Sequence, residues 1–159
     1  MDVFEIWEKA YALLDDLTPI QADCGELCNK QCCKGGDEDG MILFPYEKEF
    51  LDGQRFLKFS EKDGFETAVC KGRCKREWRP MACRIYPFVP VFKGDSIEVQ
   101  PDPRATYICP LVLHGGEYID PAFIQAVKEA FAVLAELPGF EEFMKQYDAM
   151  LDGYRKFTI

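Results

Sequence analysis

The first residues of the chain alternate between apolar and polar positions with the period of a helix. Phe4, Trp7 and Tyr11 recur at intervals of three or four residues, and Pro19 ends the pattern. Side chains at this spacing lie on one face of an α-helix, and proline cannot continue one. The pattern therefore predicts an amphipathic helix over residues 2–17.

The carboxy-terminal third repeats this helical period twice. Asp120 supplies a helix cap, Pro121 suits the first turn, and apolar residues then follow at three- and four-residue steps. Pro138-Gly139 interrupts the period, which then resumes to near the end of the chain. We predict two further helices within residues 120–156, with their apolar stripes facing the core.

Between these helices the pattern changes to short apolar runs separated by turn residues. It predicts strands at 41–46 and 65–69, and a hairpin over 88–100 whose turn begins at Gly94. A short helix is predicted at 47–59. Continuous apolar periodicity is otherwise scarce here, so this region needs a source of stability other than a core of its own.

Together these elements predict a small α+β protein with a single domain over residues 1–159. At 48% apolar composition, 159 residues are enough for one hydrophobic core. Residues 24–110 form its centre, which contains the hairpin and irregular segments that need a cross-link. The helices at 1–18 and 120–156 are expected to flank and cover this centre.

The central region contains every cysteine of the chain. The eight are Cys24, Cys28, Cys32, Cys33, Cys70, Cys74, Cys83 and Cys109. This is more than core packing requires, and disulfides, thiol chemistry and metal ions compete to explain it. The amino terminus has neither a basic start nor an unbroken apolar run, so we expect a cytoplasmic protein. Thiols stay reduced in the cytoplasm, which favours metal ligation.

The first four cysteines do not suit a single metal ion on an intact helix. In a helix, Cys24 and Cys32 would lie about 12 Å apart along the axis, whereas sulfurs around one zinc ion lie about 3.8 Å apart. Either the segment unwinds around one metal, or its cysteines are shared with the later four. We favour sharing, which distributes eight thiolates over two sites of four.

A basic run accompanies the later cysteines. From Cys70 to Arg84 the chain has six lysines and arginines against Glu77 alone, although its net charge is -9. We expect Arg79 and Arg84 to donate hydrogen bonds to metal-bound sulfur and so to form part of the cofactor site. A solvated face and a nucleic-acid patch are the alternatives. The acidic remainder of the chain argues against nucleic acid and anionic lipid, and no apolar run reaches the ~20 residues of a membrane span.

The ordered motifs CGELCNKQCC, CKGRCKREWRPMACRIYPF and Cys109-Pro110 resemble a known family. They are similar to the YkgJ-type cysteine-cluster proteins of bacteria and archaea, which are described as a zinc- or iron-chelating domain. That family has a C-x-x-C-x-x-C-C cluster, then two cysteines, Arg-Pro, Cys-Arg-x-aromatic-Pro and a late Cys-Pro. Here the first spacings are three residues rather than two. The resemblance covers residues 24–110 and implies metal binding rather than a particular reaction.

These observations lead to three functional hypotheses. The first is a cysteine-rich protein that binds Zn²⁺ through its eight thiolates, with no catalytic residues evident. The second is an iron-sulfur protein in electron transfer or a redox reaction, with [4Fe-4S] clusters or iron in place of zinc; an enzyme of this chain would then be oxidoreductase-like. The third is a protein-interaction module stapled by metal. The partner common to all three is a metal ion.

Overall fold

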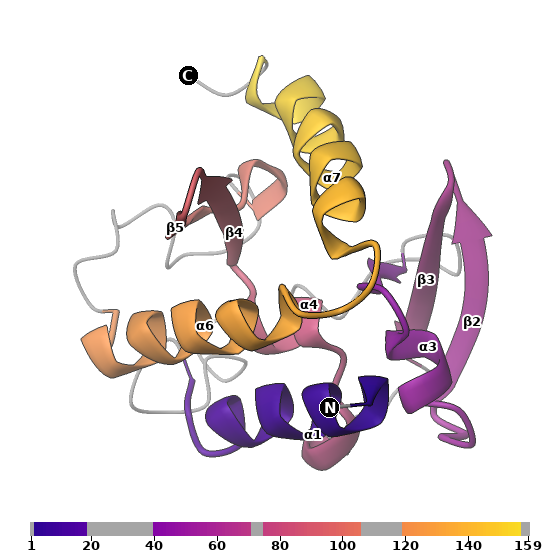
Figure 1. Cartoon of the computed structure of the whole chain (residues 1–159). Helices are drawn as coiled ribbons and strands as arrows, with labels where there is room; N and C mark the ends of the chain where they lie inside the picture. The colour runs from indigo at the N-terminus through magenta and orange to yellow at the C-terminus, as the bar shows by residue number, and fades with distance from the viewer. Residues whose placement is uncertain (1, 19–39, 71–74, 106–118, 157–159) are drawn as a thin grey trace.

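The computed structural model describes residues 2–18, 40–70, 75–105 and 119–156, and it contains both helices and small antiparallel sheets (Figure 1). This mixed architecture confirms the α+β prediction. The elements in chain order are α1 (Val3–Leu14), β1 (Met41–Ile42), α3 (Glu47–Phe50), β2 (Leu57–Lys62), β3 (Phe65–Cys70), η2 (Arg76–Trp78), α4 (Met81–Ile85), β4 (Phe88–Lys93), β5 (Ser96–Pro101), η3 (Pro103–Ala105), α6 (Pro121–Leu134) and α7 (Phe140–Arg155).

Helix α1 begins at a complete capping box. The Asp2 carboxylate accepts hydrogen bonds from the Phe4 and Glu5 amides at 2.8 and 3.0 Å, and the Glu5 carboxylate accepts one from the Asp2 amide at 3.2 Å. The apolar face predicted from the sequence is buried from Ile6 to Leu14, whereas Phe4 in the first turn is exposed. The predicted helix at the amino terminus is therefore confirmed, with its last turn at Leu14 rather than at residue 17.

The first sheet has the strand order β1-β3-β2, with every neighbouring pair antiparallel. Strands β2 and β3 form a hairpin whose two turn residues, Asp63 and Gly64, have φ angles of 55° and 85°. Positive φ at both positions is typical of the turns that match the twist of paired strands. β3 is the central strand, and it carries Cys70 at its end.

The second sheet is the predicted hairpin of β4 and β5. Its register pairs Phe88 with Pro101 and Lys93 with Ser96, so a two-residue turn joins the strands. Gly94 occupies the first turn position with φ of 62°, a conformation that glycine adopts without strain. This confirms both the hairpin and its turn.

Helices α6 and α7 follow the predicted signals closely. The Asp120 carboxylate caps α6 by accepting a hydrogen bond from the Ala122 amide at 2.9 Å, and Pro121 stands in its first turn. Gly139, with φ of 77°, lies immediately before α7. No helix within the four described ranges is long and apolar enough to cross a membrane.

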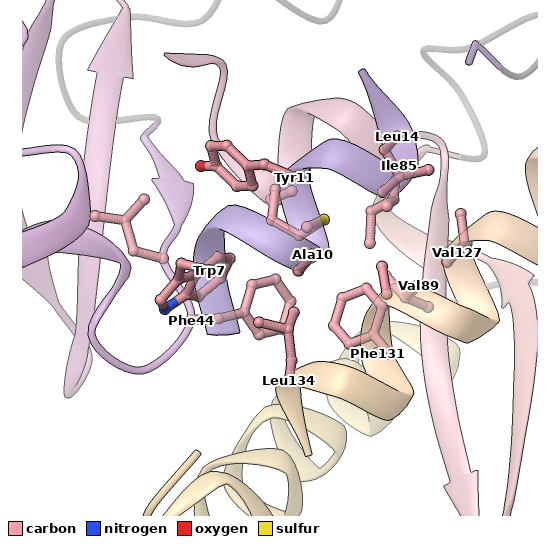
Figure 2. Packing of buried hydrophobic residues seen from close by; sticks show 14 of the residues in the cluster. Trp7, Ala10, Tyr11, Leu14, Phe44, Ile85, Val89, Val127, Phe131 and Leu134 are labelled. Atoms are coloured by element: carbon pink, nitrogen blue, oxygen red, sulfur yellow. The ribbon is translucent and has the colours of Figure 1, made fainter. Parts of the chain in front are cut away.

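The hydrophobic core lies where α1, α6 and α7 meet the central strands. α1 and α6 run side by side, and α7 leaves the end of α6 at an angle (Figure 1). Figure 2 shows side chains of α1 facing Phe131 and Leu134 of α6, with Phe44 beside them. The Phe44 ring lies 5.2 Å from that of Phe131 and 5.4 Å from that of Tyr147. The terminal helices thus share one core with the centre of the chain.

The prediction of a helix at 47–59 is wrong in extent. The helix α3 stops at Phe50, and Gly53 takes a φ of 92° that helices do not contain. Residues from Leu57 onward pair with β3 as strand β2. Hydrogen bonding to a distant strand decides the structure here, and the local period does not reveal that pairing.

Candidate metal centre

Two of the eight predicted thiolate ligands lie in the described part of the chain. Cys70 ends β3, where it pairs with Leu57 of β2, and Cys83 is the third residue of α4. Both side chains are partly exposed. The remaining predicted ligands lie outside the described residues: Cys24, Cys28, Cys32, Cys33, Cys74 and Cys109.

Within the ranges that the structure describes, no three side chains of His, Cys, Asp or Glu are grouped so that they could hold a metal ion. This finding concerns Cys70 and Cys83 alone among the cysteines. The assignment of eight ligands to two sites therefore stays a prediction. What the structure does describe is how the segments that carry the cysteines join the core.

Helix α4, which carries Cys83, is too short to be stable by itself. It has five residues, and its preceding residue, Pro80, has no side-chain group that can cap it. The carbonyl of Pro80 accepts hydrogen bonds from the amides of Cys83 and Arg84, both at 3.0 Å. The first free amide of the helix, that of Met81, needs an acceptor from elsewhere.

Glu47 supplies that acceptor from a distant part of the chain. Its carboxylate is completely buried, and its Oε2 accepts hydrogen bonds from the Met81 amide at 2.6 Å and from the Tyr11 hydroxyl at 2.7 Å. Its Oε1 accepts one from the Phe44 amide at 3.0 Å. One carboxylate thus joins α1, the turn before α3 and the first turn of α4.

Burial dominates the protonation equilibrium of this carboxyl group. Removal from water raises the pKa of Glu47 to about 7, against the opposing effect of its three hydrogen bonds and the nearby Arg84 charge. Burial also raises the pKa of the Tyr11 hydroxyl, and the charges of Glu47 and Cys83 add to that increase. Glu47 and Cys83 therefore both lie within electrostatic reach of Tyr11.

Arg84, predicted to contact metal-bound sulfur, is buried with 7% of its surface exposed. Its Nε donates to the Arg79 carbonyl at 2.7 Å, its Nη2 to the Glu77 carbonyl at 2.8 Å and its Nη1 to the Asp15 carboxylate at 3.0 Å. The guanidinium carbon also lies 3.9 Å from the centre of the Tyr11 ring. Arg84 thus joins the end of α1 to the segment between Cys74 and Cys83.

The Arg84 contacts show where two cysteine-bearing segments meet the core. Asp15, bound by Arg84, stands at the end of α1, from which the chain continues to Cys24. At the far side of that segment, Gly40 packs against β3 so closely that an added Cβ would lie 3.1 Å from the Ala68 carbonyl. The described residues on either side of the first four cysteines, Asp15 and Gly40, thus lie beside Arg84 and beside β3.

The segment leading to Cys109 is held by a second buried carboxylate. The Asp102 amide donates to the Pro87 carbonyl at 2.7 Å, which links this segment to the chain just after α4. The Asp102 carboxylate accepts hydrogen bonds from the Arg104 side chain at 2.8 to 3.2 Å. Arg104 in turn donates to the Tyr147 hydroxyl at 3.1 Å, and burial raises the pKa of Tyr147 to about 12.

The buried polar side chains of the described ranges are all hydrogen-bonded. They are Glu47, Thr67, Arg84 and Asp102. No buried side-chain nitrogen or oxygen of the described residues lacks a hydrogen-bond partner. Polar burial is costly unless it is satisfied, so these contacts stabilise the segments that they join.

Sequence reasoning identified Arg84 but missed Glu47 and Asp102. Both acidic residues stand in short polar stretches that resemble solvent-exposed turns, and acidic residues are seldom buried. The carboxylate of Asp102 is bound by Arg104 only two residues on, whereas Glu47 accepts from Met81, 34 residues away. For Glu47 the local sequence contains no signal of such a contact.

The structure also contains a groove of about 420 Å³ between β4 and α7. It is lined by apolar residues such as Phe92, Phe140 and Met144, with Glu141 and Lys145 at its rim. No cysteine of the described ranges belongs to this lining. No family model matches the chain, and neither a curated protein nor a solved structure matches it.

Proposed function

We propose that this protein binds metal ions through its eight cysteine thiolates, in two sites of four ligands. The observations that carry the proposal are the position of Cys70 at the end of β3, four residues before Cys74, and that of Cys83 in α4, whose first turn is bound to the core. Soft thiolates select zinc or iron-sulfur clusters over hard cations. The ligands would be the cysteines, with Arg79 and Arg84 in the surrounding shell.

Chain connectivity supports the gathering of the cysteines. Cys74 is four residues from Cys70 and nine from Cys83. Cys109 is four residues from Ala105, whose segment is tied to Pro87 through Asp102. A span of four residues reaches at most about 14 Å. Short tethers of this kind limit how far Cys74 can lie from Cys70, and Cys109 from Ala105.

We assign zinc as the metal. A zinc site with four thiolates carries a net negative charge, and the buried guanidinium of Arg84 beside Cys83 opposes such a charge. The alternative is an iron-sulfur protein, which four-thiolate sites and the Cys109-Pro110 motif equally accommodate. The proposed partner is thus a metal ion in a reducing cytoplasm, and a metal-dependent protein partner belongs to the third hypothesis.

The assignment of ligands predicts the effect of removing one cysteine from each group. Cys28→Ala and Cys74→Ala should each reduce the metal bound per chain, because a missing ligand leaves an open site. Metal content and resistance to a chelator measure this. Wild-type values in both variants would exclude these cysteines as ligands, and loss in only one would change their division between sites.

Replacing Arg84 removes the buried guanidinium, and we expect this to weaken metal binding while every cysteine ligand stays in place. Arg84→Ala should reduce metal retention by about 10- to 100-fold, the usual effect of losing an outer-shell partner. Arg84→Lys should restore only part, because lysine lacks the fixed set of donors. Competition with a chelator measures both.

A matched control removes the same charge elsewhere. Arg155 pairs with Asp148 and Asp152 on α7, so Arg155→Ala tests the effect of net charge alone. We expect its metal retention to equal that of the wild type. If Arg84→Ala also retained metal like the wild type, the role of Arg84 would be limited to its contacts with Asp15, Glu77 and Arg79.

A further inference from the structure

We propose that Glu47 is a positioning residue for the metal site: its buried carboxylate holds the first turn of α4, and with it Cys83, against α1. The inference rests on the proposed metal binding at Cys83. It assigns a role to a residue that is not itself a ligand and that lies outside every cysteine motif.

The helix that carries Cys83 is bound to Glu47 at its first turn. Cys83 lies two residues after Met81, whose amide donates to Glu47 at 2.6 Å. Pro80 provides no side-chain cap, and a helix of five residues has too few internal hydrogen bonds to fix its own direction. The placement of the Cys83 side chain therefore depends on what holds Met81.

The Glu47 carboxylate, which accepts the hydrogen bond from Met81, is itself held in place. Both carboxylate oxygens of Glu47 are engaged, one by the Phe44 amide and the other by Met81 together with the Tyr11 hydroxyl. The side chain is completely buried, and the Tyr11 ring is covered by the Arg84 guanidinium at 3.9 Å. An acceptor fixed at three points defines the position of its donor closely.

Glu47 places a carboxylate, rather than an apolar side chain, at a buried position. An apolar side chain would fill the same space without the desolvation of a charge, so a buried carboxylate is weak support for stability in general. Here it satisfies two backbone amides that no other described group accepts. Orientation of α4 is the property that an apolar residue would lose.

The test compares Glu47→Ala with Leu151→Ala in the full chain loaded with Zn²⁺. Leu151 is equally buried but lies on α7 and is not one of the hydrogen-bond partners of Glu47. Both substitutions leave a cavity in the core. Competition for Zn²⁺ with a chromogenic chelator and thermal unfolding are measured for each variant.

We expect Glu47→Ala to weaken Zn²⁺ binding about 10-fold or more, as the loss of a supporting residue typically does. Leu151→Ala should lower the unfolding temperature but change Zn²⁺ affinity by less than about 3-fold, within the scatter for sites that share no partners. Glu47→Gln should restore part of the affinity, because its amide oxygen can still accept from Met81. This rescue separates positioning from general stability.

Three results would overturn the inference. Wild-type affinity in Glu47→Ala would show that α4 needs no help from Glu47. Equal loss of affinity in Leu151→Ala would assign the effect to stability, and a wild-type chain that binds no Zn²⁺ would remove the proposed function as well. If Glu47→Ala does not fold, Glu47→Gln and Tyr11→Phe are judged against Leu151→Ala by the same comparison.

Discussion

Replacement of Cys83 by alanine is expected to remove about half of the metal that the protein binds. Cys83 supplies one of eight thiolates, and a site left with three ligands is open to water and to chelators. The second site should keep its metal, because it draws on different cysteines. Metal analysis after passage of the variant over a chelating resin measures the metal remaining per chain.

The design of this variant separates ligand loss from damage to the helix. Alanine is the best helix former, and Cys83 is partly exposed, so the substitution should leave α4 intact. Ala82→Ser on the same helix is the matched control, because it alters α4 and keeps every thiol. Full metal content in Cys83→Ala would exclude Cys83 as a ligand.

The second large expected effect is a dependence of the free energy of unfolding on pH. Because the pKa of Glu47 is raised from 4.5 to about 7, the folded chain holds this proton more tightly than the unfolded chain. The stabilisation is complete below about pH 4.5 and is lost as the pH rises through about 7. The corresponding decrease in the free energy of unfolding is at most about 3 kcal/mol.

Comparison with Glu47→Gln isolates this contribution from every other titrating group. Tyr11 and Arg84 influence the pKa of the carboxylate, and Cys83 influences that of Tyr11, but all three are present in both chains. Denaturant unfolding from about pH 4.5 to about pH 8 should show the wild type losing stability relative to Glu47→Gln. A difference that stays constant, or that grows in favour of the wild type as pH rises, would contradict the raised pKa.

The elements that could be predicted from the sequence are those with long or local signals. α1, α6 and α7 span three or more turns, so their apolar periods are unambiguous. The local sequence Gly94-Asp95 predicts the turn of the β4–β5 hairpin. In each case the residues that decide the structure are close neighbours in the chain.

The β2 strand could not be predicted in this way. Leu57 and Phe59 alternate with polar residues for only a short distance, and Glu61 and Lys62 are exposed at its end. Its pairing with β3, which runs from Leu57 opposite Cys70 to Lys62 opposite Phe65, is what makes it a strand. This pairing depends on the tertiary structure, and the helical pattern of residues 47–59 gives no indication of it.

The residues of the candidate metal site also fall into two groups, those that the sequence indicates and those that only the structure shows. The cysteines and Arg84 were identified because their residue types and spacing are unusual for a core. Glu47 was missed because its role comes from burial and from the Met81 amide 34 residues away. Residue types in the sequence indicate candidate ligands, whereas the residues that hold those ligands in position are recognised only in the folded structure.

Anaerobic purification of the full chain, followed by metal analysis and a visible spectrum, is the direct test of metal binding by the thiolates. We expect about two zinc ions per chain and no absorption in the visible range. Brown protein with iron and sulfide would keep the thiolate sites but replace zinc by iron-sulfur clusters. Protein without stoichiometric metal, in which all eight thiols react with a thiol reagent, would contradict the claim.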